Sequence, residues 1–416
     1  MKPTMKMFLL LFVIFQVQGT GMALTEENGK INIHGYLSQG FLLSTRNNFI
    51  LDSKKGTFHF NELGLNFTTQ LTDRIHIGIQ FSARDFGDKG NDKVVIDWAF
   101  ADYNWRNWLG LRVGKIKIQY GFYNKTRDID MLRTFILLPQ SIYPEIYRDT
   151  ATSMKGIGLY GVFSPFSMGN VSYQAAIGAT DTDLEGSTVD LFETTGDINI
   201  TNCNVSRLFN GNLSWETPLK GLRIGLSLLN IKLKCLGTLT KDVIFPLNFP
   251  PYMITIARKG DIFNVEFSKY RINVFSAEYT WNNFVLAAEY MKMQQKMNVN
   301  VIDRYKNLRL WDTESYYISG TYRFSEQFEL GINYSAYMTD LNGIPDAPLV
   351  LPYLDYQNDL CAAVRFDLNP HWTFKVEGHL IEGAALCFPK YNLNDAGIPV
   401  FARNWALFGA KVTCTF

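Results

Sequence analysis

Side chains capable of nucleophilic or acid–base catalysis are few in this sequence and stand far apart. The five histidines follow no hydrolase pattern, because none lies in a Gly-x-Ser-x-Gly or His-Glu-x-x-His context. A covalent catalyst needs a nucleophile beside a base, and the sequence places no such pair together. It also has no glycine-rich phosphate-binding loop. These features predict neither an enzyme nor a protein with a bound cofactor.

The cysteines show no metal-binding pattern. Their spacing matches no zinc motif, and no Cys-x-x-Cys occurs among Cys203, Cys235, Cys361, Cys387 and Cys414. An odd number at such wide spacing also excludes a disulfide-rich scaffold. We therefore predict no metal site from the sequence.

Charged side chains are abundant and balanced, with 40 Lys and Arg against 39 Asp and Glu. This balance provides no basic excess for nucleic acid, so nucleic-acid binding is not expected. One long loop defined below, residues 119–154, carries Lys125, Arg127, Asp128, Asp130, Arg133, Glu145, Arg148 and Asp149. Facing charges of both signs set ion selectivity when they line a pore. The elements that position these charges therefore decide what they can do.

The dominant pattern from Ile31 onward is alternation with a period of two. In residues 75–84 (IHIGIQFSAR) every odd position is apolar and every even one is polar or glycine, which is typical of a strand with one apolar face. Sixteen segments show this pattern: 31–45, 58–71, 75–84, 94–105, 109–118, 155–164, 169–181, 205–218, 221–234, 263–281, 283–294, 315–324, 328–340, 357–369, 372–383 and 405–416. Mean hydropathy is only −0.06, too polar for a bundle of membrane helices.

The connections between these segments alternate strictly between short and long. Seven are one to about four residues, and eight are nine or more: 46–57, 85–93, 119–154, 182–204, 235–262, 295–314, 341–356 and 384–404. Large aromatic residues such as Trp105, Trp108, Trp281 and Trp372 flank the short turns. Both features are typical of a transmembrane antiparallel β-barrel with periplasmic turns, extracellular loops and aromatic girdles. We predict an all-β barrel of 16 strands; 18 stay open if segment 263–281 or a long loop contains a further pair.

The face opposite the apolar one carries charges, and a barrel of this size is too wide for side chains to fill. Because unpaired charges in a dry core cost several kcal/mol each, we predict a wet lumen; a sealed barrel filled with paired salt bridges is the alternative. The predicted lumen-lining residues are His76, Asp97, Arg223, Arg323, Arg365, Lys375, Glu377 and Lys411, with Glu289, Glu329 and Asp367 sharing their parity.

Loop 119–154 is the longest. Residues 111–149 resemble a strand-to-loop passage of a porin-like family, and that resemblance implies that such a loop can fold into the lumen and narrow it. Under this hypothesis Arg127, Asp128, Asp130 and Arg133 form a constriction. They would face the wall residues Arg84 and Arg112 across the pore. The alternative is that the loop charges lie on the outer surface and contact nothing that permeates.

Two cysteines fall close to register in one predicted hairpin. The eighth and ninth segments turn at Leu219–Lys220, so paired residue numbers sum to about 439, whereas Cys203 and Cys235 sum to 438. We treat a disulfide between them as an open hypothesis against free thiols, since exported proteins permit such bonds.

The N-terminus has the form of a cleavable signal peptide, residues 1–23. Lys2 and Lys6 precede an apolar stretch, Met7 to Val17, that is too short for a spanning helix. Gly21 and Ala23 supply small residues for cleavage. An uncleaved membrane anchor is the alternative. We expect export, with residues 24–416 forming the barrel.

Two stretches carry a resemblance to known proteins. The last segment, 405–416, has apolar residues at alternate positions and ends on Phe416; it resembles the assembly signal of Gram-negative outer-membrane barrels. Residues 111–115 (LRVGK), then 120–124 (YGFYN), Arg127–Asp128 and 138–143 (LPQSIY) resemble the strand-to-loop passage of a porin-like family.

The resemblance implies a porin in outer-membrane lipid, inserted by the barrel-assembly machinery and forming a homotrimer. The local motif covers only 111–149, so no substrate can be carried over. We predict passive diffusion of small hydrophilic solutes and ions. A channel selective for one anion, sugar or organic acid, and a sealed barrel with an adhesive or enzymatic role, remain alternatives.

Overall fold

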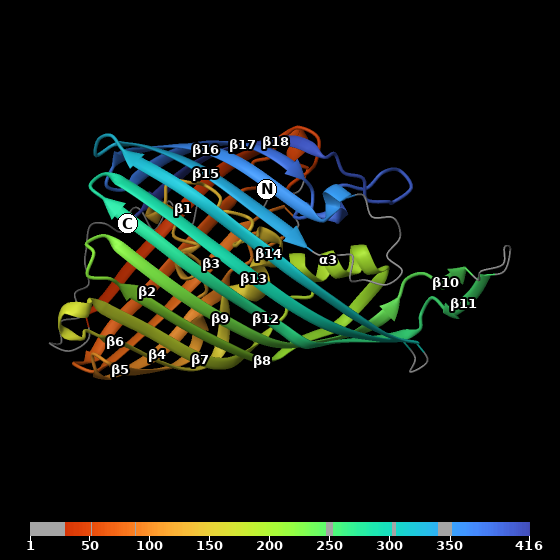
Figure 1. Cartoon of the computed structure of the whole chain (residues 1–416), viewed down its shortest axis with the longest axis horizontal. Helices are drawn as coiled ribbons and strands as arrows, with labels where there is room; N and C mark the ends of the chain where they lie inside the picture. Colours follow the sequence, from red (N-terminus) through yellow and green to blue (C-terminus); the bar gives the residue numbers. More distant parts are fainter. Residues whose placement is uncertain (1–29, 51, 88, 247–252, 302–304, 340–351) are drawn as a thin grey trace, which may run out of the picture.

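The computed structural model describes residues 30–416 apart from residues 51, 88, 247–252, 302–304 and 340–351. The signal peptide predicted for residues 1–23 lies outside this range. Sixteen antiparallel strands form one closed barrel in the order β1-β18-β17-β16-β15-β14-β13-β12-β9-β8-β7-β6-β5-β4-β3-β2 (Figure 1). The prediction of 16 rather than 18 barrel strands is thereby confirmed.

Most strands begin and end within a few residues of the predicted segments, whereas β8, β9, β13 and β14 extend further toward the long-loop end. Their bounds are β1 Ile31–Ser44, β2 Asn61–Thr72, β3 Ile75–Asp85, β4 Val95–Arg106, β5 Leu109–Lys117, β6 Ser153–Phe163, β7 Asn170–Asp181, β8 Ile198–Glu216, β9 Leu222–Leu239, β12 Ile262–Trp281, β13 Phe284–Val301, β14 Tyr305–Arg323, β15 Phe328–Thr339, β16 Tyr356–Asn369, β17 Trp372–Gly383 and β18 Asn404–Thr415. A separate hairpin, β10 Val243–Pro246 and β11 Met253–Ala257, lies within the connection predicted as loop 235–262.

Among the residues that the structure describes, helices are short and confined to the connections. They are η1 Ser53–Lys55, η2 Asn124–Thr126, η3 Asp130–Leu132, η4 Glu145–Tyr147, α2 Arg148–Ala151, η5 Phe166–Met168, α3 Ser187–Gly196, η6 Pro352–Leu354 and η7 Pro389–Tyr391. None of the helices in the described residues is long and apolar enough to cross a membrane.

The barrel closes where its first and last strands meet. β1 pairs with β18 from Tyr36–Thr415 to Ser44–Leu407. The backbones of Gly35 and Phe416 extend this pairing with two hydrogen bonds, of 3.0 and 3.1 Å. The C-terminal residue therefore belongs to the seam that closes the sheet.

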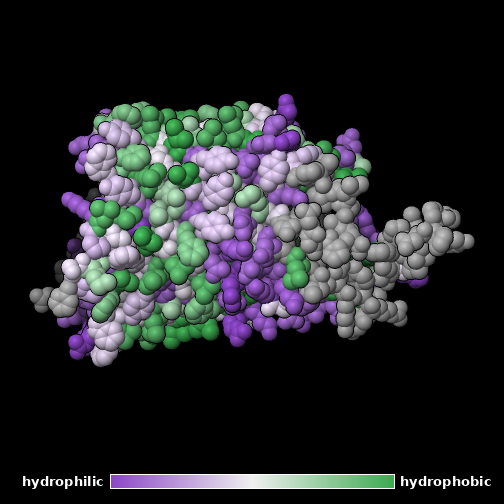
Figure 2. All heavy atoms as spheres, in the orientation of Figure 1, coloured by the Kyte–Doolittle hydropathy of each residue, from purple (hydrophilic) through white to green (hydrophobic). Residues whose placement is uncertain are grey.

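Apolar side chains cover the outer face, as the alternation predicts. Ile33, Leu213, Ile332 and Leu380 point outward and are exposed. Figure 2 shows apolar side chains over the part of the barrel nearer the short turns, and a hydrophilic patch where β12, β13 and β14 run on toward the other end. Trp105, Trp108, Trp281 and Trp372 are exposed at the short-turn end.

Three predicted loops at the other end, 182–204, 235–262 and 295–314, are shorter in the structure because strands extend into them; β9, for example, runs to Leu239. β8 begins at Ile198, inside predicted loop 182–204, and β13 and β14 take up most of predicted loop 295–314. In this part of β13 the alternation continues with reversed polarity: Met291 and Met293 are buried, whereas Lys292 faces outward and pairs with Glu314 of β14. Predicting strands from an apolar outer face therefore makes these strands too short at the long-loop end.

Candidate functional site

The connection between β5 and β6, residues 118–152, crosses the inside of the barrel; we call it the internal loop. Its backbone and side chains form hydrogen bonds with strands that are not its neighbours in the sheet. The Thr134 hydroxyl donates to Glu329 Oε1 on β15 at 2.5 Å, and the amide of Ile136 donates to Glu377 Oε2 on β17 at 2.7 Å. The amide of Gly121 donates to Ser227 Oγ on β9 at 3.0 Å. The loop is thus held against much of the inner wall.

One anchor of the internal loop is a buried charge cluster around Asp130. Its carboxylate lies 3.1 Å from Lys375 Nζ and 3.9 Å from Lys411 Nζ, and it accepts a hydrogen bond from the Thr413 hydroxyl at 2.8 Å. Burial alone would raise the pKa of Asp130, but Lys375, Lys411 and Arg133 outweigh it and hold the pKa far below the usual range. The ionised carboxylate therefore ties the loop to β17 and β18.

A second anchor is Glu289 on β13. Its carboxylate accepts hydrogen bonds from the amide of Phe122 (2.7 Å) and the hydroxyls of Tyr143 (2.5 Å) and Ser276 (2.6 Å). Gly121 has a φ of +57° beside this site, and a Cβ there would lie 2.1 Å from the Tyr143 hydroxyl. Glycine satisfies both the left-handed backbone and the close approach.

A third anchor is a chain of ion pairs that runs from the loop to the wall. Glu145 pairs with Arg127 at 2.8 Å and with Arg148 at 3.3 Å, and Arg148 in turn pairs with Glu62 on β2 at 2.5 Å. Glu62 also binds Lys411 at 2.9 Å. Burial would raise the pKa of Glu145, but the two arginines hold it at about 2.

Asp128 forms the connection to β3 and β5. It accepts hydrogen bonds from Gln80 at 2.7 Å and Lys117 at 3.0 Å, and Lys117 also pairs with Asp97 at 2.6 Å. Asp97 reaches this inner position because a register shift in the β3–β4 pairing leaves it between Ile96 and Trp98.

The four loop residues predicted at a constriction are brought together, but as anchors rather than as a free rim. Arg127, Asp128 and Asp130 are 3%, 6% and 1% exposed, too buried to face open water. Arg133 donates to the carbonyls of Arg127 and Ile136 at 2.7 and 3.1 Å. Their charge is used to hold the loop in place.

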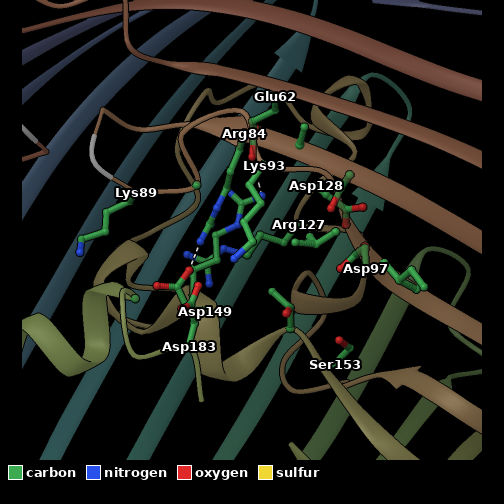
Figure 3. Close-up of a pocket in the computed structure, with 18 of the residues that line it drawn as sticks. Glu62, Arg84, Lys89, Lys93, Asp97, Arg127, Asp128, Asp149, Ser153 and Asp183 are labelled. Atoms are coloured by element: carbon green, nitrogen blue, oxygen red, sulfur yellow. Dashed lines mark hydrogen bonds and ion pairs between the residues drawn. The ribbon is translucent and has the colours of Figure 1, made fainter. Parts of the chain in front are cut away.

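The two predicted wall partners lie apart. Arg84 pairs with Asp149 at the end of the internal loop, and Figure 3 shows the two side chains meeting in a charged pocket. Arg112 is not in that pocket: three residues from the β4–β5 turn, it forms a bidentate pair with Asp102 at 2.6 and 2.7 Å and covers the Phe100 ring at 4.2 Å. The prediction that Arg112 faces the loop residues is therefore wrong. Parity shows that a side chain points inward, but it does not show how far along the barrel axis the side chain lies.

The predicted lumen-lining residues fall into two groups. His76, Arg223 and Arg323 lie near the short turns with side chains about one third exposed. The others are covered or contacted by the internal loop and its partners. This second group comprises Asp97, Arg365, Lys375, Glu377 and Lys411.

Beyond the loop, toward the long-loop end, the described residues enclose two cavities that bear on function. The first, about 370 Å³, is the charged pocket of Figure 3. It is lined by seven basic and seven acidic side chains: Arg84, Lys89, Lys93, Lys115, Lys117, Arg127 and Arg148, with Glu62, Asp97, Asp128, Asp149, Asp181, Asp183 and Glu185. The mixed signs give this pocket no net charge.

The second cavity, about 520 Å³, is bordered by the internal loop, α3 and the inner faces of β8, β9, β12 and β13. Its wall is mainly apolar, with Leu208, Leu229, Ile231 and Met291 among the lining residues. This surface is not predicted from the sequence, because the alternation pattern indicates a uniformly polar inner face.

Cys361, Glu377 and His379 offer ligand atoms within 4.8 Å of one another, and all three are buried. His379 Nδ1 and the Glu377 carboxylate also have partners outside this group. His379 bonds through Nδ1 to Asp359 at 2.9 Å and contacts Glu377 through Nε2 at 3.1 Å. Glu377 also accepts the amides of the loop at Ile136 and Leu137. This arrangement positions the loop.

Cys203 and Cys235 are direct cross-strand partners, joined by a disulfide in the structure with an Sγ–Sγ distance of 2.01 Å. The one-residue discrepancy in register disappears because the pairing shifts between Val205 and Arg207. Strand arithmetic alone could not include such a bulge.

Several residues that anchor the internal loop are not among the site residues predicted from the sequence. Glu62 and Lys117 lie on the inner face, and Glu145 and Arg148 lie in the internal loop, where the sequence marks them only as charged. The sequence does contain a signal for Glu62. It lies at the same alternate positions of β2 as Gly64 and Asn66, which places its side chain on the inner face.

The sequence matches no protein-family model and no curated protein. Solved structures are similar in fold. OmpF of Salmonella typhi, solved with daunomycin, superposes with a TM-score of 0.55 at 14% identity, over 94% of this chain and 98% of that one. The anion-selective porin of Comamonas acidovorans gives 0.53 at 12% identity, covering 94% and 100%. OmpT of Vibrio cholerae, in a trimer form, gives 0.52 at 12% identity, again covering 94% and 100%.

These identities are too low to carry over function, and the likeness shows the fold alone. The chain has the 16-stranded barrel fold of the Gram-negative outer-membrane porins.

Proposed function

We propose that this protein is an outer-membrane channel of the porin type, through which small hydrophilic solutes and ions diffuse passively. The short turns would face the periplasm and the long loops the exterior, as in other barrels of this class. Residues 1–23 would direct export and be removed, leaving residues 24–416. The apolar outer face and the aromatic side chains at the short-turn end support placement in lipid.

The internal loop is the observation that carries the proposal. A structural or adhesive barrel has no need of a 35-residue segment held across its interior by three sets of buried polar contacts. A loop so placed narrows the lumen at a defined height. It separates the accessible charges near the short turns, such as Arg223 and Arg323, from the two cavities at the other end.

A homotrimer fits this proposal. One of the similar structures is described as a trimer form, and insertion by the barrel-assembly machinery would use the C-terminal strand that ends on Phe416. We propose no enzymatic role, because the clustered polar residues of the interior described above serve as anchors.

The test is single-channel recording of the refolded protein in a planar bilayer under a salt gradient. Discrete current steps are expected, and the reversal potential gives the sign of ion selectivity. A variant with residues 124–144 replaced by a short Gly-Ser linker should conduct more than the intact protein. A folded barrel that shows no steps, with or without this segment, would refute the channel.

A solute-selective channel is the second candidate. It is favoured by the division of the space beyond the loop into one charged and one uncharged cavity, which a non-selective pore does not require. Saturable conductance, blocked by one class of solute, distinguishes selective from general diffusion.

A further inference from the structure

The apolar cavity results from the polarity reversal in the long strands. On β9, Leu229, Ile231 and Leu233 point inward, while Lys232 and Lys234 between and beyond them are exposed. On β13, Met291 and Met293 point inward and Lys292 outward. This part of the barrel is therefore charged outside and apolar inside, the opposite of a wall that faces lipid and encloses water.

No charged side chain lines this cavity among the residues the structure describes. The charged pocket, by contrast, has fourteen. An ion entering the apolar cavity would lose its hydration and meet no opposite charge, which costs several kcal/mol. A neutral apolar molecule would gain free energy from removing its own surface and that of the wall from water. The cavity therefore discriminates by charge.

The polar side chains in the cavity wall are all uncharged: four tyrosines, four threonines and one glutamine. Tyr147 hydrogen-bonds Tyr337, and Tyr270, Thr188 and Gln295 also lie in the wall. A cavity of about 520 Å³ is of the size that holds a small organic ligand, and such sites combine an apolar wall with a few polar groups that fix orientation. Two fused rings with one hydroxyl group match this chemistry.

The cavity is also positioned to receive solutes from the long-loop side. Leu354, Ala384 and Phe401 line it from connections at that end, and Tyr120 and Ile142 of the internal loop form its boundary on the other side. The disulfide between Cys203 and Cys235 joins β8 and β9 at the same wall.

We propose that this cavity binds an uncharged, mainly apolar small molecule carrying one or two hydrogen-bonding groups. The proposal deepens the channel function: it names the class of solute that would bind on the outer side of the internal loop. It rests on the proposed function only for the transport that would follow binding.

The probe is 2-naphthol, a neutral fluorescent double ring with one hydroxyl, with 2-naphthoate as a charged molecule of the same ring system. Binding is measured by fluorescence titration of the full chain in lipid nanodiscs, with empty nanodiscs as the blank for partition into lipid. Saturable binding of 2-naphthol at one site per chain is expected, at least tenfold tighter than 2-naphthoate.

Leu229→Asp places a charge in the cavity wall, whereas Asn230→Asp places the same charge on the exposed face one residue later. The first should weaken 2-naphthol binding at least tenfold, and the second should leave it unchanged. If Leu229→Asp does not fold, Met293→Gln, which keeps the side-chain length, should weaken binding by a smaller factor. Equal binding of the two probes, or binding unaffected by the wall variants, would overturn the proposal.

Current recordings separate the two proposals. Channel steps without saturable 2-naphthol binding would remove the ligand site and leave the channel. Saturable binding by a barrel without steps would support the site and remove the channel.

Discussion

Replacing Asp130 with asparagine is the sharpest test of how the internal loop is held. Asparagine keeps the shape and can still accept the 2.8 Å hydrogen bond from Thr413, but it removes the charge that faces Lys375 at 3.1 Å. The Lys375 side chain is fully buried, and it retains only carbonyl acceptors, Asp130 O at 2.6 Å and Phe135 O at 3.5 Å.

Breaking a buried ion pair by removing one partner costs about 3–5 kcal/mol, because the remaining charge is left uncompensated. At about 1.4 kcal/mol for each factor of ten, the equilibrium between the docked and released loop should shift by roughly a hundredfold to several thousandfold. Single-channel recordings of Asp130→Asn should therefore show higher open-channel noise and higher mean conductance than the parent protein. The unfolding temperature of the refolded barrel should also fall.

Two further variants control this experiment. Asp130→Asn combined with Lys375→Met removes the stranded charge and should recover part of the lost stability. Glu382→Gln breaks an ion pair with Arg403 whose side chains are 42% and 58% exposed, and should change stability by less than about 1 kcal/mol. If Asp130→Asn matches the parent protein in noise, conductance and unfolding temperature, the internal loop is not held by this cluster.

Other predictions follow from single residues. The pKa of Glu145 lies at about 2 against an ordinary 4.5. Its contribution to loop anchoring, about 3 kcal/mol, is therefore complete above pH 4.5 and is lost as the pH falls toward 2. Glu145→Gln should abolish the part of the pH dependence of channel noise that comes from this carboxylate. Peptide mapping without reduction should recover Cys203 linked to Cys235, and replacing both with serine should lower stability by about 2–4 kcal/mol. Gly121→Ala should loosen the loop at neutral pH and raise open-channel noise, since its added Cβ has no room. Deletion of Phe416 should slow assembly in vivo while leaving refolding in detergent intact, and equal assembly rates would argue against its signal role.

Barrel topology could be predicted from the sequence because the outer face imposes a local rule. Each strand that contacts lipid needs an apolar residue at every second position, and the segment from Ile75 to Arg84 shows this without reference to any other segment. The rule fails where strands leave the apolar band. Lys292 and Glu314 face outward there, so the pattern reverses although the backbone pairing of β13 and β14 continues.

The site was less predictable because its contacts join distant parts of the chain. Parity places Lys375 and Glu377 on the inner face, and the resemblance to porins implies that residues 119–154 enter the barrel. Nothing local pairs Asp130 with Lys375, which is 245 residues away, or Ile136 with Glu377, 241 residues away. These pairings depend on the path of the internal loop, which is set by all of its anchors together.

Inward charges alone do not show that water fills a barrel. Their inward positions predict a wet lumen for Lys375, Glu377 and Lys411, yet these side chains are 0%, 1% and 2% exposed and are bonded to the loop or its partners. The accessible charges are those near the short turns, such as Arg223 and Arg323. In the proposed channel, charges near the short turns should change ion preference, because they alter the local concentration of ions. Charges that hold the internal loop, such as Asp130, should instead change pore size by holding or releasing the loop. Neutralising Arg323 should therefore shift the reversal potential at nearly constant noise, and Asp130→Asn should raise the noise at a nearly constant reversal potential.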